Sequence, residues 1–423
     1  MQIKSLTLGA VACAATVFAT SLAQAADAKA VVKTYADVAE AMYQDSLTSA
    51  MTLKDAVSAL VSKPTEGTLK AARGAWVDAR VPYQQTEGLR FGNTIVDDWE
   101  GKVNAWPLDE GLLDYVDASY GTSSDENPAY TLNLIANKKV RLGPDMIDAS
   151  IITPELLSGN LHEAQEVEAN VATGYHAIEF MLWGQDLNGN GPGAGMRPAS
   201  DFNTKDCTGG NCDRRVQFLV AATDLLIADL KEMVDAWGPN GAARADISGK
   251  SEKEGLATIL TGLGSLSYGE LAGERIKLGL ILHDPEEEHD CFSDNTHNSH
   301  YYNQVGMVAL YNGAYKKLDG SYVKGASLAD YAGAKASGAN ATLDKLMGTA
   351  LDKMQVMKDT ADSGKMAYDQ MIGEGNAEGN KIIQDVVDGL VAQTKGIEKL
   401  VSALDLKISV EGSDSLDNPS AVE

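Results

Sequence analysis

The chain has 423 residues, with 35 lysines and arginines against 60 aspartates and glutamates, which gives a formal net charge of −25 at pH 7. Such an acidic chain is a poor partner for nucleic acid or for an anionic membrane. It fits a cation-attracting surface or simple solubility. The length is ample for a hydrophobic core and predicts two domains or one large duplicated unit.

The first 25 residues are typical of a secretory signal peptide. Lys4 precedes an apolar run over positions 6–22, and Ala23-Gln24-Ala25 has the small-x-small form of a signal-peptidase site. This run is short for a membrane span, and no other uninterrupted run reaches that length. We therefore expect a mature periplasmic protein without a transmembrane segment. Lipid anchoring at Cys13 is disfavoured because the preceding residues form a poor lipobox.

Helical periodicity dominates the rest of the chain, and no alternation typical of strands recurs. We expect helices at 29–61, 66–91 with a kink or break at Pro82, 161–183, 213–237, 251–282, 327–337, 341–371 and 377–404. The predicted fold class is therefore all-α, built from helical bundles.

Less regular segments separate these helices. Residues 97–120 are predicted to be loop and short helix, 132–151 are ambiguous, and 285–302 are predicted to be a polar loop. We divide the mature chain into an N-terminal bundle at 26–210, a C-terminal bundle at 211–408 and an acidic, frayed tail at 409–423.

The helix that ends at Trp183 carries the most unusual polar face. His176, Glu179 and Trp183 lie three and four residues apart, so a helix places them side by side, while an apolar stripe occupies another face. An ordinary exposed helix carries lysine and glutamate at such positions. We therefore expect a helix covered on both sides, with one face in a bundle core and the other lining a pocket.

The pair His176-x-x-Glu179 offers an imidazole and a carboxylate to one ion. Nitrogen and oxygen donors together suit iron, zinc or manganese better than calcium or magnesium. Two ligands do not make a tight site, and we expect Glu87 and Glu270 to complete it. The alternative is a packed His–Glu hydrogen bond without metal.

The spacing is also half of a zinc-protease signature, but Phe180 stands where the second histidine is required. No phosphate-binding loop, dinucleotide fingerprint or serine-hydrolase elbow is present in the sequence. Nucleotide chemistry and serine hydrolysis are therefore unsupported, and whether the chain is an enzyme stays open.

One further helix repeats the alternation of aromatic and polar residues, and another carries a polar stripe. Trp76, Arg80, Tyr83 and Glu87 are spaced four, three and four apart, and a third stripe runs from Ser267 to Lys277. The residues expected to shape the pocket are Trp76, Arg80, Tyr83, Trp183, Glu274, Arg275, Asp294 and His297.

The run from His283 to His300 contains four of the six histidines. We expect it to cap the pocket and to supply hydrogen bonds around the ligands. Histidines facing solvent in such a tract could instead bind metal loosely.

Three cysteines follow the signal segment. Cys207 and Cys212 enclose Thr-Gly-Gly-Asn and predict a small disulfide-closed loop, although this spacing could also hold a metal. Cys291 is left over, either buried and free or part of the His-rich cluster. The segment beginning at Asp186 starts like a calcium loop, but Arg197 occupies the twelfth position, where a glutamate is needed. We expect a turn organised by asparagine side chains there.

Taken together, these motifs resemble the imelysin family, which includes a protein described as an insulin-cleaving metalloprotease and the iron-regulated protein A group. The matching segments are Gly174-x-His176-x-x-Glu179, 76–91, Trp106-Pro-Leu-Asp-Glu-Gly, Gly184-Gln-Asp, 269–275 and 293–297. The resemblance implies two four-helix-bundle-like halves related by duplication, with His176 and Glu179 in a cleft between them. It also implies a link to iron uptake.

We therefore expect an exported protein that binds iron, or zinc in its place, and serves iron acquisition. A ferric chelate is a second form of cargo, since Arg80, Arg90 and Arg275 could hold an anionic ligand. A membrane component of iron import is the expected partner. The alternatives are a metallopeptidase that uses the same His–Glu pair and a structural surface protein without metal.

Overall fold

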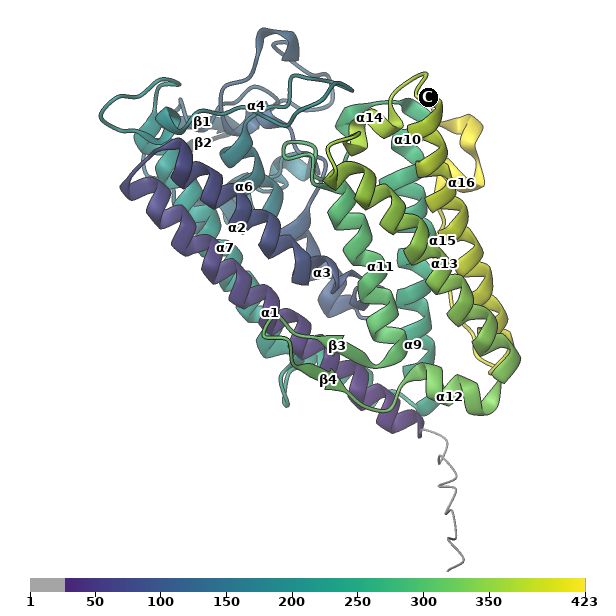
Figure 1. Cartoon of the computed structure of the whole chain (residues 1–423). Helices are drawn as coiled ribbons and strands as arrows, with labels where there is room; N and C mark the ends of the chain where they lie inside the picture. The colour runs from purple at the N-terminus through teal and green to yellow at the C-terminus, as the bar shows by residue number, and fades with distance from the viewer. Residues whose placement is uncertain (1–26, 423) are drawn as a thin grey trace, which may run out of the picture.

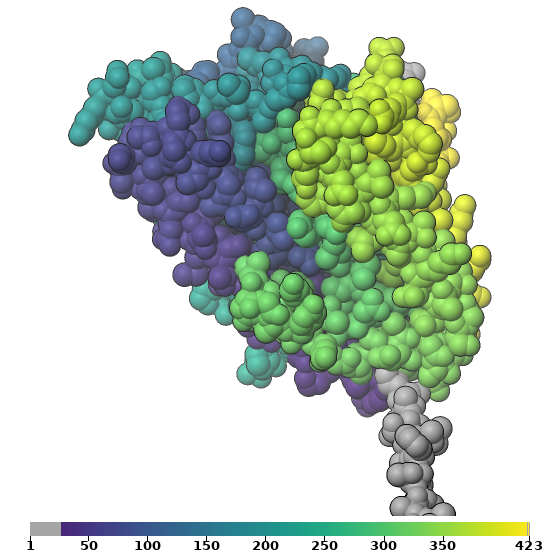
Figure 2. Space-filling view, viewed as in Figure 1, coloured from purple at the N-terminus to yellow at the C-terminus, as the bar shows by residue number. Residues whose placement is uncertain are grey.

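The computed structural model of the chain describes residues 27–422, so the predicted signal peptide and Cys13 lie outside the described residues. The described part is dominated by helices that pack in two groups (Figure 1), as the all-α prediction requires. In Figure 2 the purple and blue surface of the first group meets the green and yellow surface of the second across the visible face. None of the described helices is both long and apolar enough to cross a membrane.

The first group is organised around the long helix α1 (Ala28–Ser62), which packs along α2 (Glu66–Gln84) and α7 (Cys212–Trp237). The short helix α6 (Gly174–Trp183) packs against α2, α7 and α3 (Thr94–Asn104). The smaller helices of this part are α4 (Glu110–Leu113), α5 (Pro154–Leu156) and α8 (Ala242–Gly249).

The second group contains a helix that changes its winding. α9 (Glu252–Ser265) continues through a π-helical segment (Leu266–Lys277) into α10 (Leu278–Leu282). α15 (Ala377–Ala403) packs along this helix and along α13 (Ser337–Asp362), which also contacts α11 (Thr296–Asn312). The smaller helices are α12 (Leu328–Lys335), α14 (Tyr368–Ile372) and α16 (Asp414–Asp417).

The two groups are joined by contacts of α11 with α2 and of α1 with α9. Close backbone approach at this junction requires glycine. A Cβ atom on Gly262 would lie 2.2 Å from the carbonyl oxygen of Gly88, and one on Gly306 would lie 2.3 Å from that of Gln85. Gly262 and Gly306 thus allow the two groups to pack closely. The relation of the groups by duplication stays a prediction.

Two short hairpins accompany the helices of this all-α fold. β1 (Lys139–Leu142) pairs antiparallel with β2 (Asp145–Asp148), and β3 (Ala314–Lys316) pairs antiparallel with β4 (Tyr322–Lys324). Each strand has only three or four residues, too few for a period of two to stand out from a helical pattern. The first hairpin occupies the segment whose sequence is ambiguous.

Three predicted helices are too long. The helix expected at 341–371 is divided, because α13 ends at Asp362 and α14 begins at Tyr368. The helix expected at 161–183 begins only at Gly174, and Glu163, Gln165 and Glu166 before it have positive φ angles. Its apolar spacing therefore extends beyond the real helix. The helix expected at 66–91 passes through Pro82 but ends at Gln84, within one turn of that proline.

Two polar segments are more ordered than predicted. The loop expected at 285–302 already becomes α11 at Thr296, so His297 and His300 are helical. The acidic tail expected to fray packs on the π-helical segment, with Ser413 and Ser415 buried and the carbonyl oxygen of Glu411 beside Gly269. In both cases polar side chains are buried against other polar groups, which a hydrophobic pattern cannot reveal.

Candidate metal centre

The position of His176 is fixed by the first turn of α6. Gly174 has a φ of +75°, and a Cβ atom there would lie 2.3 Å from the carbonyl oxygen of Val103 in α3. Only glycine combines this backbone conformation with this approach. All ten residues of α6 are buried, which agrees with the expectation of a helix covered on both sides.

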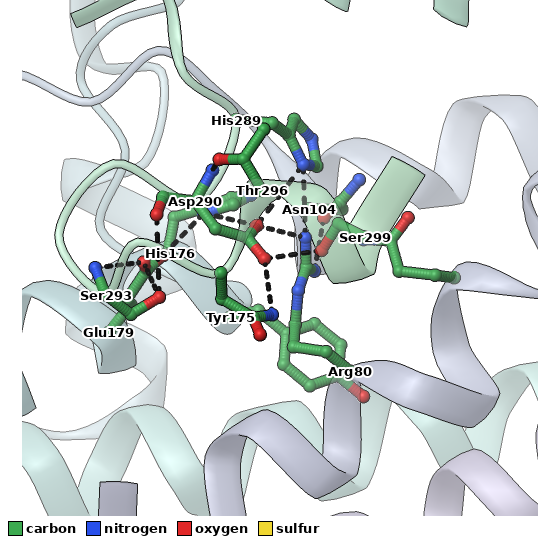
Figure 3. A network of polar contacts seen from close by, with 12 residues as sticks. Arg80, Asn104, Tyr175, His176, Glu179, His289, Asp290, Ser293, Thr296 and Ser299 are labelled. Carbon is green, nitrogen blue, oxygen red and sulfur yellow. Dashed lines mark hydrogen bonds and ion pairs between the residues drawn. The ribbon is translucent and has the colours of Figure 1, made fainter. Parts of the chain in front are cut away.

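His176 meets two residues of the loop that precedes α11 (Figure 3). One ligand atom each from His176, His289 and Asp290 can be chosen so that all three lie within 4.8 Å of one another. Oδ1 of Asp290 is 3.3 Å from Nδ1 of His289 and 4.0 Å from Nδ1 of His176. All three side chains are almost fully buried. We call this group the histidine–aspartate cluster.

Hydrogen bonds hold the cluster from both sides. Nδ1 of His176 lies 3.0 Å from Oε2 of Glu179, and the other oxygen of Glu179 accepts hydrogen bonds from the backbone N–H and the hydroxyl of Ser293. On the far side, Arg80 donates to Oδ1 of Asp290 over 2.7 Å and to Oδ1 of Asn104 over 2.6 Å. The second oxygen of Asp290 accepts hydrogen bonds from the side chains of Asn295 and Ser299.

Burial and the arginine set the charge state of this site. Burial, reinforced by Arg80, lowers the pKa of His176 to about 3, so its imidazole is neutral at neutral pH. Burial, reinforced by Asp290, raises the pKa of Glu179 well above its usual value. Burial alone would also raise the pKa of Asp290, but Arg80 and His289 hold it well below its usual value.

Among the imidazoles of the described residues that keep a ring nitrogen without a hydrogen-bond partner, His176 belongs to the cluster and His300 lies beside it, with its ring centroid 6.3 Å from that of His289. Nε2 of His176 has no hydrogen-bond partner, and neither ring nitrogen of His300 has one. Buried polar atoms normally find partners. Unpaired neutral nitrogens beside a buried carboxylate are the donor set that iron or zinc prefers, so the residues present fit such an ion.

Glu87 and Glu270, the other expected ligands, belong to an ion-pair cluster with arginines. Nη2 of Arg275 is 2.8 Å from Oε2 of Glu87 and 2.5 Å from Oε1 of Glu270, and Arg90 is 3.2 Å from Glu270. Burial alone would raise the pKa of Glu270, but Arg275 and Arg90 lower it to about 2. Both carboxylates are thus engaged by arginine, and their role as metal ligands stays a prediction.

The expected aromatic residues support the helices around the site. Trp76 donates its indole N–H to the carbonyl oxygen of Tyr175 and packs edge-on against Trp183, with ring centroids 5.4 Å apart. Tyr83 packs 4.8 Å from Tyr175, and the guanidinium of Arg80 lies 5.0 Å from the ring of Tyr175. These rings position Arg80 rather than offer donor atoms to the cluster.

The other expected pocket residues are dispersed. Glu274 is exposed, and Nε2 of His297 lies 3.1 Å from Oδ1 of Asp362. Asp294 lies among other carboxylates. Cys207 and Cys212 form a disulfide beside the start of α7, while Cys291 is free. Asn188 donates to Asp186, which gives the expected asparagine-organised turn.

Sequence reasoning did not single out His289 and Asp290 from their His-rich run. The adjacent His-Asp pair was the available signal, because it combines a neutral nitrogen donor with a carboxylate. Nothing in the local sequence shows which of the four histidines would turn toward α6. That choice depends on Arg80, which lies 3.2 Å from His289 and binds Asp290 from a distant helix.

Comparisons with known proteins agree with this fold. The chain is 35% identical over 71 residues to iron-regulated protein A of Synechococcus elongatus, a match that covers 16% of this chain and 20% of that relative. The chain therefore aligns with only about a fifth of the length of that curated relative.

Two solved structures share the fold over nearly the whole chain. One is described as an iron-regulated protein A precursor from Parabacteroides distasonis, with a TM-score of 0.62, 17% identity, and coverage of 89% of this chain and 94% of that one. The other is an imelysin-like protein from Psychrobacter arcticum, with a TM-score of 0.57, 15% identity, and coverage of 91% and 99%. The imelysin family model matches residues 39–397, and the chain therefore belongs to the imelysin family.

Proposed function

We propose that this chain is an exported metal-binding protein that serves iron acquisition, with iron held at the histidine–aspartate cluster. The observation that carries the proposal is the convergence of His176, His289 and Asp290, with Nε2 of His176 left without a partner. Relatives named iron-regulated protein A support iron over other ions. The disulfide between Cys207 and Cys212 supports export, because disulfides persist in oxidising compartments.

Each residue has a distinct role in this proposal. His176 and His289 supply neutral nitrogen donors and Asp290 supplies an oxygen. Glu179 orients the imidazole of His176 through their 3.0 Å contact, as a carboxylate commonly does for a metal-binding histidine. Arg80 holds Asp290 in place and competes with a cation for the same oxygen. The site is therefore expected to bind and release its ion, which suits cargo rather than a permanent structural metal.

A bare ion is better supported than a ferric chelate. The donor residues are at most 1% exposed, which leaves no room for an organic ligand around them. Arg275 and Arg90, which could have held an anionic chelate, are engaged by Glu87 and Glu270. A cavity of about 490 Å³ is lined by Trp106, whose ring centroid lies 5.7 Å from that of His289, and in this proposal a small ion enters from that side.

Peptidase activity is the weaker candidate. A metallopeptidase needs an open coordination position, a general base, and space for a polypeptide at the metal. The donors are buried, and the residue one turn after His176 that a zinc-protease signature requires to be histidine is Phe180. A membrane partner in iron import stays part of the proposal as the component that would receive the ion.

Metal content of the purified mature protein tests this function. The protein would be exposed to ferrous, ferric or zinc salts, passed through gel filtration and analysed for bound metal. We expect near-stoichiometric iron in the wild type and its loss in His176→Ala and His289→Ala. His162→Ala is the matched control, because this partly buried histidine pairs with Glu163 outside the cluster.

Two other outcomes would contradict the proposed iron site or favour the alternative. Retention of iron in both His176→Ala and His289→Ala would place the metal elsewhere and overturn the proposal. Preferential zinc, together with cleavage of an unstructured polypeptide that disappears in His176→Ala, would favour the peptidase.

A further inference from the structure

A second group of carboxylates lies beside the histidine–aspartate cluster and is not used by it. Asp186, Glu286, Glu288 and Asp369 line a small cavity of about 10 Å³. They come from three distant parts of the chain: the loop after α6, the segment before α11, and α14. Figure 1 shows α14 at the same end of the molecule as the loops above α6. We call this group the carboxylate cavity.

Two of these side chains are buried without partners. Asp369 is 2% exposed, and neither of its carboxylate oxygens has a hydrogen-bond partner. Glu288 is 1% exposed, and its Oε1 also has none. Both residues line the carboxylate cavity. Burying an uncompensated carboxylate is costly, so each such oxygen in a folded protein requires an explanation.

Two other buried carboxylates of this protein show one way in which such a cost is met. Asp114 is held by Arg215 and Arg197, and Asp290 by Arg80. Around the carboxylate cavity, by contrast, the charged groups that shift the pKa of Asp369 and Asp294 are all carboxylates. Burial and these neighbours raise the pKa of each to about 7. These carboxylates therefore lack a positively charged partner.

Hydrogen bonds also connect the segments that line the cavity. The backbone N–H and the side-chain amide of Asn188 donate to Oδ1 of Asp186 over 2.9 and 2.7 Å, which leaves Oδ2 available. The side chain of Asn190 donates to the backbone carbonyl of Asp369 over 3.0 Å. The loop that begins like a calcium loop thus delivers its first carboxylate to the cavity and anchors α14. This loop lacks the glutamate of a calcium loop at its twelfth position, and the other carboxylates that line the cavity belong to Glu286, Glu288 and Asp369.

A larger cavity adjoins this position. The carboxylate cavity shares Asp186, Glu286 and Cys291 with the larger cavity of about 490 Å³, which adds Asp109 and Glu110 to its lining. Acidic walls concentrate cations near a site. The smaller cavity has the volume of about one water-sized body, which suits a single ion and excludes an organic ligand.

We propose that the carboxylate cavity is a second metal site, which binds a hard divalent cation of the Ca²⁺ type through Asp369, Glu288, Glu286 and Asp186. Oxygen-only donors select hard cations, whereas the imidazoles of the histidine–aspartate cluster select iron or zinc. The bound ion neutralises Asp369 and Glu288 and fixes α14 to the loops that cover the first site. This inference stands apart from the proposed function, because the two sites share no donor residue.

Calcium titration of the chelator-treated mature protein tests the second site. Isothermal titration calorimetry with calcium chloride is expected to show saturable binding of about one equivalent, with a dissociation constant of about 10⁻³ M or tighter. Asp369→Asn should weaken binding about tenfold or more. The control Asp352→Asn, at an exposed position of α13, should bind as the wild type does.

Thermal unfolding gives a second readout. In the absence of calcium, Asp369→Asn should raise the melting temperature, because it removes an uncompensated buried carboxylate, and it should abolish the increase that calcium produces in the wild type. No saturable calcium binding by the wild type, or equal binding in Asp369→Asn, would overturn the proposal. His176→Ala separates the two sites, since it should lose iron and keep calcium.

Discussion

The ion-pair cluster and the histidine–aspartate cluster lie near the junction of the helix groups. They differ in how the charge of their carboxylates is compensated. In the ion-pair cluster, each of Glu87 and Glu270 has an arginine nitrogen within 2.8 Å. At the histidine–aspartate cluster, Asp290 is the carboxylate that pairs with Arg80. Glu179, which lies beside the cluster, contacts only the neutral imidazole of His176 among ionisable side chains. Nε2 of His176 is left unpaired there.

This difference indicates a stabilising role for the ion-pair cluster and a metal-binding role for the histidine–aspartate cluster. A buried carboxylate paired with arginine satisfies its charge inside the protein, so a metal ion would have to displace the arginine. A cluster with neutral imidazoles and an unpaired ring nitrogen gains from an added cation. Sequence spacing alone assigned Glu87 and Glu270 to the same site as His176, because glutamate at helical spacing looks identical in both environments.

Replacing the arginine of the ion-pair cluster should have the largest effect on stability. Arg275→Met leaves the buried Glu87 and the partly buried Glu270 without their closest partner, and we expect the free energy of unfolding to fall by about 3–5 kcal/mol. Urea unfolding measures this. Lys231→Met, which breaks an exposed pair with Asp235, should change it by less than about 1 kcal/mol. Equal effects of the two variants would contradict the assignment of a stabilising role.

Gly174→Ala should damage both stability and metal binding. The positive φ at this position costs a non-glycine residue about 1–3 kcal/mol, and the added Cβ would lie 2.3 Å from the carbonyl oxygen of Val103. Displacement of the first turn of α6 would move His176 out of the cluster. Gly348→Ala is the control: nothing lies within 4 Å of its Cβ, and we expect a gain of up to about 1 kcal/mol. A fully stable, metal-binding Gly174→Ala would refute this account of the helix start.

Metal should stabilise the wild type but not a variant of the histidine–aspartate cluster. At a free iron concentration of 100 times the dissociation constant, binding adds about 2.7 kcal/mol to the free energy of unfolding. This gain should disappear in His289→Ala and persist in Arg275→Met, provided that variant remains folded. Thermal unfolding with and without iron makes the comparison. An unchanged gain in His289→Ala would remove this residue from the site.

The effect that is smallest per step of the measurement, here one pH unit, concerns the larger cavity. Burial and the nearby Glu286 raise the pKa of Glu110 from 4.5 to about 8. Between these values the folded protein keeps a proton that the unfolded chain releases, so stability should fall as pH rises, by up to about 1.4 kcal/mol per pH unit. Glu110→Gln should flatten this part of the stability curve. If Glu110 had its usual pKa, the free energy of unfolding would change with pH equally in the wild type and in Glu110→Gln across this window.

Much of the fold could be predicted because it follows from local pattern. The helix expected at 29–61 is α1, and that expected at 377–404 is α15, since long amphipathic runs with clear ends specify helices. The hairpins and the irregular residues before Gly174 were missed, because their conformations depend on positive φ angles and tertiary contacts.

The candidate site was predictable only in part. His176, Glu179 and Arg80 carried a readable signal, since aromatic and ionisable residues alternate on their helices. His289 and Asp290 did not, because their role depends on a loop that folds back across α2 and α6. Long-range contacts of this kind leave no spacing in the sequence.

Anomalous diffraction at the iron absorption edge from crystals of the iron-loaded protein tests the central claim most directly. The account predicts one strong peak at about 2.0–2.2 Å from a nitrogen of His176, a nitrogen of His289 and an oxygen of Asp290. A peak bound by Glu87 and Glu270, with Arg275 displaced, would assign the metal to the ion-pair cluster. That result, or the absence of any peak at the histidine–aspartate cluster, would contradict the account.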